Sequence, residues 1–165
     1  MSLVFIGLGS NLGDGRANLQ EAWQRLGTAA RLNRIGLSSP YLSTPVGMTS
    51  TQWFTNAVGV LQTSIAPDDL LAVLLNVERD MGRDRSLGKD RMIDLDILYY
   101  DDLVCHTASL ILPHPEIANR LFVLAPLVEL APDHLHPVAG QSSRQMRRLL
   151  AAAVGQEIKK ITWND

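Results

Sequence analysis

The alternation of apolar stretches with turn residues over the first 100 residues narrows the possible folds of this 165-residue chain more than any other feature. Short runs of Val, Ile, Leu and Phe, or alternating apolar and polar residues, are typical of strands, whereas apolar residues at i, i+3, i+4 and i+7 are typical of helices. These patterns predict strands at residues 3–8, 32–38, 54–63 and 93–97, and helices at residues 16–27 and 67–82. The expected order is strand, helix, strand, strand, helix, strand.

Both expected helices have the amphipathic spacing of a helix that covers a sheet. Between Leu19 and Leu26 the apolar side chains recur at helical spacing. Pro67 suits the first turn of the second helix, where its missing N–H is not needed. Asp68 and Asp69 then interact favourably with the positive end of the helix dipole. Each helix therefore presents one apolar stripe that must pack on another element.

This order of elements is the ferredoxin-like βαββαβ arrangement, an antiparallel sheet with both helices on one face. Residues 116–130 and 142–154 also have helical spacing, and we expect Pro126 to interrupt the first of these segments. These additional C-terminal helices would cover the other face. The sequence thus predicts an α+β fold, a three-layer α-β-α sandwich. Because no repeat, low-complexity tract or linker divides the chain, we expect residues 1–165 to form a single domain.

Composition excludes several classes of partner and site. A net charge of -2 and a pI near 6.1 give no long-range field, so neither nucleic acid nor an anionic membrane is an expected partner. The single cysteine, Cys105, can form neither an intramolecular disulfide nor a thiolate zinc cluster. The apolar runs are far shorter than the ~20 residues of a membrane span, and no basic signal-peptide region follows Met1. We therefore expect a cytoplasmic monomer.

Asp94 and Asp96 are the first candidates for chemistry, because residues two apart on a strand point to the same face. Their Cα atoms should lie roughly 6.6 Å apart along the strand, which allows both carboxylates to reach a metal. Mg²⁺ prefers a few carboxylates together with water and phosphate oxygens, and paired ions can clamp a phosphoryl-transfer site. The competing interpretation is a strand with one solvated face, on which alternating acids need no function.

Basic residues crowd the segment immediately before this pair, at Arg79, Arg83, Arg85, Lys89 and Arg91. Guanidinium groups bind phosphate oxygens through a rigid fork, so this segment could neutralise a polyphosphate. Acidic residues alternate with the bases, however, and a solvated, salt-bridged loop explains the cluster equally well.

The remaining motifs are incomplete. Gly7, Gly9 and Gly13 resemble a dinucleotide fingerprint with the wrong spacing, and no acid follows where ribose recognition would need one. A reductase using a phosphorylated nicotinamide stays an alternative, although a tight turn between strand and helix explains the glycines better. The sequence has no P-loop motif and no Ser-His-Asp or Cys-His constellation. His114 lies between two prolines and close to Arg120, a group suited to phosphate binding.

Several short motifs follow one another along nearly the whole chain. In chain order they are Gly9-Ser10-Asn11-Leu12-Gly13, Ser43-Thr44-Pro45, Phe54-Thr55-Asn56-Ala57, residues 78–83, Arg91-x-x-Asp94-Leu95-Asp96-Ile97-Leu98, Leu112-Pro113-His114-Pro115 and Asn119-Arg120-Leu121-Phe122. Each motif is modest alone, but their order and spacing are specific. Together they resemble the 6-hydroxymethyl-7,8-dihydropterin pyrophosphokinase family.

The resemblance implies a Mg²⁺-dependent transferase of folate biosynthesis that moves a pyrophosphoryl group from ATP, its co-substrate, to the hydroxymethyl group of the pterin and releases AMP. It implies that Asp94 and Asp96 hold two Mg²⁺ ions and that Arg83 and Arg91 complete the catalytic set. The pterin contacts would be Thr44, Pro45, Val46, Phe54, Asn56 and Phe122. The ATP contacts would be Leu71, Glu78, Arg85, Ile97, His114 and Arg120.

A non-catalytic pterin- or nucleotide-binding module is the contrasting interpretation, since the ferredoxin-like scaffold hosts many unrelated functions. Such a module has no need to retain Asp94, Asp96 and Arg91 together. A divergent paralogue that acts on a related pterin is a further alternative, because residues 87–90 before Arg91 lack the tryptophan that is common in the family.

Overall fold

The computed structural model describes residues 1–45, 53–82, 86, 90–152 and 155–164. Its elements, in chain order, are β1 (Ser2–Ser10), α1 (Gly15–Thr28), β2 (Leu32–Leu37), β3 (Tyr41–Ser43), β4 (Phe54–Thr63), α2 (Pro67–Asp80), β5 (Asp94–Tyr100), β6 (Cys105–His106), β7 (Ile111–Leu112), a 3₁₀ turn (Ile117–Asn119), α3 (Leu121–Leu130), α4 (Ser143–Ala151) and β8 (Ile158–Lys160). The expected order of strands and helices up to Tyr100 is confirmed, with β3 as an addition.

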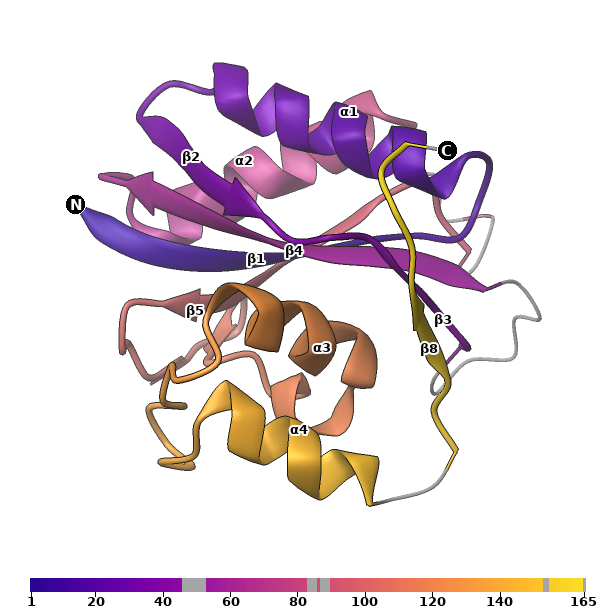
Figure 1. The fold of residues 1–165 in the computed structure, drawn as a ribbon. Helices are drawn as coiled ribbons and strands as arrows, with labels where there is room; N and C mark the ends of the chain where they lie inside the picture. Colours follow the sequence, from indigo (N-terminus) through magenta and orange to yellow (C-terminus); the bar gives the residue numbers. More distant parts are fainter. Residues whose placement is uncertain (46–52, 83–85, 87–89, 153–154, 165) are drawn as a thin grey trace.

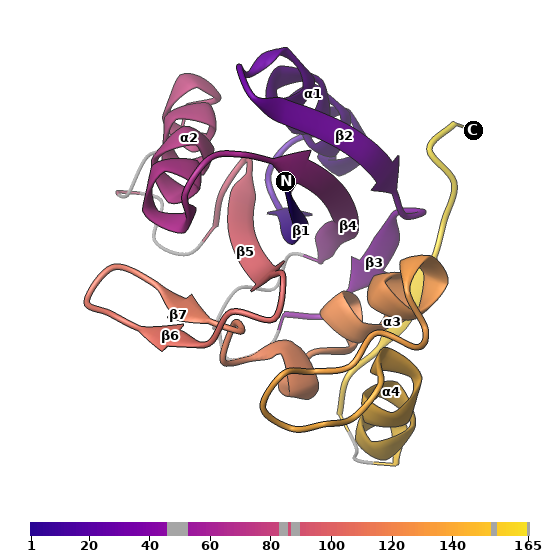
Figure 2. The ribbon, with the colours of Figure 1, turned by 90° about the vertical axis from the view of Figure 1, so that its left-hand side faces the viewer.

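One antiparallel sheet runs through the molecule in the order β5-β1-β4-β3-β8, and β2 pairs with the half of β4 that β3 leaves open. β1 is central, since it pairs over its full length with β4 and along its other edge with β5. The core strands thus lie in the order β5-β1-β4-β2, which is the ferredoxin-like order and confirms the expected fold. β6 and β7 form a separate two-stranded hairpin (Figure 2).

Helices cover both faces of the sheet (Figures 1 and 2). On one face, Leu19 and Leu26 of α1 and Leu70 and Leu74 of α2 pack with Ile6 of β1 in the larger apolar core. The i, i+4 and i, i+7 spacing of these helix residues brings them onto one stripe, which is why the helices settle there. The three-layer arrangement is therefore confirmed.

The second apolar core lies on the other face, under α3 and α4. Phe5, Val58 and Leu98 of the sheet contact Leu124 and Leu127 of α3 there. This core covers only part of the face, and a pocket lined by both polar and apolar residues occupies the rest.

The segment around Pro126 corrects one expectation. Pro126 does not interrupt the helix but lies inside α3, which runs from Leu121 to Leu130. A proline removes one hydrogen bond from a helix, but the residues from Val123 to Leu127 are buried in the second core, which holds the helix together. In the described part of the chain, no helix is long and apolar enough to cross a membrane.

Candidate active site

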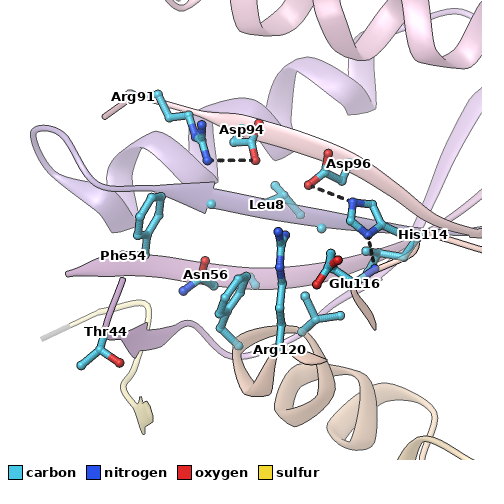
Figure 3. A pocket seen from close by; sticks show the side chains of 16 residues that line it. Leu8, Thr44, Phe54, Asn56, Arg91, Asp94, Asp96, His114, Glu116 and Arg120 are labelled. Carbon is cyan, nitrogen blue, oxygen red and sulfur yellow. Dashed lines mark hydrogen bonds and ion pairs between the residues drawn. The ribbon is translucent and has the colours of Figure 1, made fainter. Parts of the chain in front are cut away.

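A pocket of about 320 Å³ opens over β1, β4 and β5, on the face of the sheet that α3 partly covers (Figure 3). Alternation along β1 explains its floor. Ile6 and Leu8 point into the larger core, whereas Gly7 and Gly9 line the pocket without side chains. A Cβ at Gly9 would lie only 3.1 Å from Oδ1 of Asn56. Glycine therefore lets the backbone and the amide approach this closely, whereas a side chain would displace the amide by a few tenths of an ångström.

Asp94 and Asp96 form one wall of this pocket. They pair with Gly9 and Gly7 across the sheet, and Leu95 between them is buried in the core on the opposite face. The expectation that both carboxylates share a face is confirmed. Their side chains are only 28% and 38% exposed, so they line a recess and not a freely solvated surface.

The electrostatics of this pair favour a bound cation. Burial, and after it the negative charge of Asp94, raises the pKa of Asp96 to about 7, while Arg120 and Arg91 act in the opposite direction. A fully ionised pair is therefore costly near neutral pH unless positive charge is present. A cation between the carboxylates would relieve both the repulsion and the loss of hydration.

Glu78 adds negative charge from the other side of the sheet. It lies on the inner face of α2, is 6% exposed, and accepts a hydrogen bond of 2.7 Å from the backbone N–H of Leu95. Its charge also raises the pKa of Asp96. Glu78 therefore acts on the site through the strand and does not line the pocket.

Two arginines face the pocket from opposite sides (Figure 3). Nη2 of Arg91 lies 3.7 Å from Oδ2 of Asp94, and the guanidinium group stands 5.7 Å from the ring centroid of Phe54. The guanidinium group of Arg120 stands 5.5 Å from the ring centroid of Phe122. Both groups are thus held over aromatic faces, from which they can bind anionic oxygens.

His114 completes the polar side of the pocket. Its Nδ1 accepts a hydrogen bond of 3.1 Å from the backbone N–H of Glu116, and its Nε2 lies 3.9 Å from Oδ2 of Asp96. Burial, and then the charge of Arg120, lowers the pKa of His114. The ring is therefore neutral at pH 7 and, with Nδ1 accepting, carries its proton on Nε2, which faces the carboxylate.

The other end of the pocket suits a flat ring. Phe54 and Phe122 supply aromatic faces, and Asn56 supplies a buried amide. Nδ2 of Asn56 donates a hydrogen bond of 2.7 Å to Oγ of Ser43, which is 2% exposed. Because that bond holds the amide nitrogen, Oδ1 stays beside Gly9 as an acceptor for a ring N–H group.

Residues 5–132 match the model of the 7,8-dihydro-6-hydroxymethylpterin-pyrophosphokinase (HPPK) family, which is well over half of the chain. The chain belongs to the HPPK family. A protein named 2-amino-4-hydroxy-6-hydroxymethyldihydropteridine pyrophosphokinase from Methylorubrum extorquens is 37% identical over 147 residues, 88% of this chain and 91% of that protein. The protein of that name from Pseudomonas aeruginosa is 35% identical over 159 residues, 96% of each chain.

Longer relatives contain the HPPK unit as one part. The chain spans 38% of the bifunctional protein FolKE of Lactococcus lactis, to which it is 39% identical over 131 residues, 79% of this chain. The crystal structure of wild-type Plasmodium falciparum HPPK-DHPS superposes with a TM-score of 0.76 at 15% identity, over 92% of this chain and 44% of that one. At such low identity this likeness concerns the fold alone, and it agrees with the ferredoxin-like HPPK arrangement.

Most of the residues expected in an HPPK site come together in the pocket. Those that line it are Thr44, Phe54, Asn56, Arg91, Asp94, Asp96, His114, Arg120 and Phe122. Pro45 is described but does not line it, and Val46, Arg83 and Arg85 lie outside the described residues.

Three residues that are expected to contact ATP do not line the pocket. The side chains of Leu71 and Ile97, like that of Glu78, are on the face of the sheet that α1 and α2 cover. Ile97 is 3% exposed there because it alternates with Asp96 along β5. The structure therefore does not place these three side chains in the pocket. Two residues to which the sequence assigned no role support the site: Oγ of Ser43 accepts from Asn56, and the backbone N–H of Glu116 donates to His114.

The topology also decides against the nicotinamide alternative. A dinucleotide-binding motif needs a parallel βαβ unit, whereas every strand pair described here is antiparallel. Gly13, with a φ of 68°, instead allows the turn between β1 and α1.

Proposed function

We propose that this chain transfers the pyrophosphoryl group of ATP to the hydroxymethyl group of 6-hydroxymethyl-7,8-dihydropterin in folate biosynthesis. The hydroxymethyl oxygen attacks the β-phosphorus, the bond from that phosphorus to the oxygen bridging to the α-phosphorus breaks, and AMP leaves with that oxygen. The hydroxyl proton passes to solvent. The single observation that carries the proposal is that Asp94, Asp96 and Arg91 line the same pocket as two aromatic rings and a buried amide.

The pterin binds at the end of the pocket that has the aromatic rings. Phe54 and Phe122 take its two faces, and Oδ1 of Asn56 accepts from a ring N–H group. Thr44 lines the same end and contacts the edge of the ring, whereas contacts of Pro45 and Val46 with the pterin stay predictions. Holding the ring this way places its hydroxymethyl group toward the carboxylates, and such alignment supplies much of the rate in phosphoryl transfer.

ATP phosphates bind on the polar side. Arg91 and Arg120 neutralise the oxygens that gain charge as the bond to AMP breaks, and neutral His114 donates from Nε2. Arg83, which lies outside the described residues, stays a predicted contact of the transferring group. Contacts of ATP with Leu71, Glu78, Arg85 and Ile97 stay predictions.

Mg²⁺ is the cofactor in this proposal, with two ions expected. The described residues contain no cluster of three or more metal-binding side chains, but two carboxylates in a recess fit Mg²⁺, which takes its other ligands from water and phosphate. The raised pKa of Asp96 agrees with a site built for a cation. Bound at Asp94 and Asp96, Mg²⁺ would offset phosphate charge and align the oxygens.

The decisive experiment is incubation with ATP, Mg²⁺ and the pterin, followed by identification of the nucleotide product. Wild-type protein should release AMP. Asp94→Asn and Asp96→Asn should each lose at least about 100-fold in turnover, as is usual when a main charge-stabilising group is removed. Asp102→Asn, in the exposed turn after β5, is the matched control and should keep full activity. Release of ADP, or near-normal turnover in the two site variants, would overturn the proposal.

Binding of the pterin without release of AMP would favour the non-catalytic module. We further propose that residues 1–165 act as one domain and as a cytoplasmic monomer, with ATP and the pterin as partners. Both apolar cores share one sheet, which supports the single domain. Size-exclusion chromatography coupled to light scattering tests the monomer.

A further inference from the structure

The turn after β1 is tied to the segment that carries Arg91. Asn11, which is 7% exposed, donates a hydrogen bond of 2.7 Å from Nδ2 to Oδ1 of Asp90 and accepts one of 2.7 Å at Oδ1 from the backbone N–H of Arg91. Its own backbone N–H donates to the carbonyl oxygen of Arg91 at 3.1 Å. Asn11 therefore bonds both backbone groups of Arg91 and the side chain of the preceding Asp90, which fixes the backbone at Arg91.

Asn11 is itself held in a rigid turn. Nδ2 of Asn18 in α1 donates to Oγ of Ser10 at 3.1 Å and to the carbonyl oxygen of Leu12 at 2.8 Å. Asp14 caps the same helix by accepting from its first turn. The residues on both sides of Asn11 are thus fixed to α1, and the turn can act as a firm support for a segment about 80 positions away in the sequence.

The side chain of Arg91 has an N–H group available for a ligand. The guanidinium group of Arg91 extends over the ring of Phe54 toward Asp94. Its Nε is buried and has no hydrogen-bond partner among the described residues. A buried N–H group at a pocket wall is satisfied when an oxygen of the ligand arrives. Because the side chain reaches the pocket from a fixed peptide, a shift of that peptide would misplace the guanidinium group.

We infer that Asn11 is a positioning residue for pyrophosphoryl transfer, which acts through Arg91 and does not touch substrate. This inference rests on the proposed function. It gives the Gly9-Ser10-Asn11-Leu12-Gly13 motif a role other than ligand binding, because Asn11 aligns Arg91 with the transferring group. Misplacement of a catalytic group by about 1 Å can cost on the order of 100-fold in rate.

A double-mutant cycle separates positioning from general stability. Asn11→Ala should lower kcat roughly 10- to 100-fold while the KM for the pterin changes by less than about threefold. In the Arg91→Ala background, the same substitution should change kcat by less than about twofold, because residues that act through one group are not additive. A normal kcat in Asn11→Ala, or the same loss in both backgrounds, would overturn the inference.

Thr63→Ala is the matched control. Thr63 is fully buried, and its Oγ1 donates a hydrogen bond of 2.8 Å to the carbonyl oxygen of Arg31 and accepts one of 2.9 Å from the backbone N–H of Ile65. It lies at the end of β4 that pairs with Ser2, away from the pocket. Thr63→Ala should lower the melting temperature as Asn11→Ala does and leave kcat nearly unchanged. If Asn11→Ala does not fold, Asn11→Asp, which keeps the shape and the acceptor but repels Asp90, replaces it in the cycle.

A spectroscopic readout keeps the inference testable if wild-type protein releases no AMP, the outcome by which the proposed function fails. The Nε–H signal of Arg91 in a ¹H–¹⁵N spectrum can be assigned by its loss in Arg91→Ala. In Asn11→Ala this signal should shift or broaden, and in Thr63→Ala it should stay in place. An unchanged signal in Asn11→Ala would overturn the positioning role without bearing on the reaction.

Discussion

Glu129 joins α3 to the strand that leads into the pocket, and its removal should weaken the fold in a pH-dependent way. Its carboxylate accepts hydrogen bonds from the backbone N–H of Ser39 at 3.0 Å, from Oγ of Ser39 at 2.7 Å and from the hydroxyl of Tyr41 at 2.9 Å. Burial alone would raise the pKa of Glu129, but the bonds from Ser39 and Tyr41 outweigh it, and the pKa is lowered from its usual 4.5.

The size of the stability loss follows from how deeply each of the three donors is buried. Tyr41 is 5% exposed, so Glu129→Ala would leave its hydroxyl without a carboxylate in a place that water hardly reaches. A hydrogen bond to a charged partner contributes about 1.5–3 kcal/mol. The donors of Ser39 are accessible enough for water to replace the carboxylate. We therefore expect a loss of about 1.5–3 kcal/mol, equivalent to a fall in melting temperature of roughly 3–12 °C for a chain of this size.

Urea unfolding between pH 7 and pH 3 tests both the size and the sign. Because the folded pKa of Glu129 lies below its unfolded value, its contribution is fully present above about pH 4.5 and is lost as the pH falls through the folded pKa. The free-energy gap between wild-type protein and Glu129→Gln, which keeps the shape but not the charge, should therefore close on acidification. A gap that does not narrow between pH 7 and pH 3, or a Glu129→Ala variant as stable as wild type at pH 7, would refute the reasoning.

Two further predictions concern the pocket. Because the pKa of Asp96 is raised to about 7, the affinity for Mg²⁺ measured by calorimetry should rise with pH up to about 7 and then level off. In Asp94→Asn, which removes a neighbouring negative charge, that rise should move to lower pH. A pH-independent affinity would contradict this prediction. Ser43→Ala removes the hydrogen bond that orients the amide of Asn56 and should raise the KM for the pterin about tenfold, or ~1.4 kcal/mol. Ser43→Thr, which keeps a hydroxyl, should have a KM near that of wild type. Equal KM values for both variants would count against the assigned amide orientation.

The long elements could be predicted from sequence because their periodicity is strong. β4 begins and ends at the predicted residues, 54 and 63, and both helices of the core lie within two residues of the prediction. β3 and β8 were missed, since three residues contain too little alternation to reveal a strand. Each pairs along an edge of the sheet, and only the assembled fold shows which edge is open.

The site divides along a similar line. Asp94 and Asp96 could be paired from sequence because strand geometry places them on one face, and the same alternation would have placed Ile97 on the other. Glu78 shares the inner stripe of α2 with Leu74, so its burial could also have been read from the helical period. The partner of Asn11 could not be predicted, because no local rule links it to a residue about 80 positions away.

Catalytic activity depends on the register in which β1 pairs with its two neighbouring strands. Its two neighbours fix it so that Gly7 and Gly9 face the pocket while Ile6 and Leu8 face the core. A slip of β1 by one residue would turn each of its side chains to the opposite face of the sheet. Branched side chains would then fill the pocket, and glycines would replace them in the core. A chain misfolded in this way could still be compact, yet it could bind no ring. After refolding, the recovery of AMP release would therefore report correct pairing of the central strand more sharply than the recovery of helical signal.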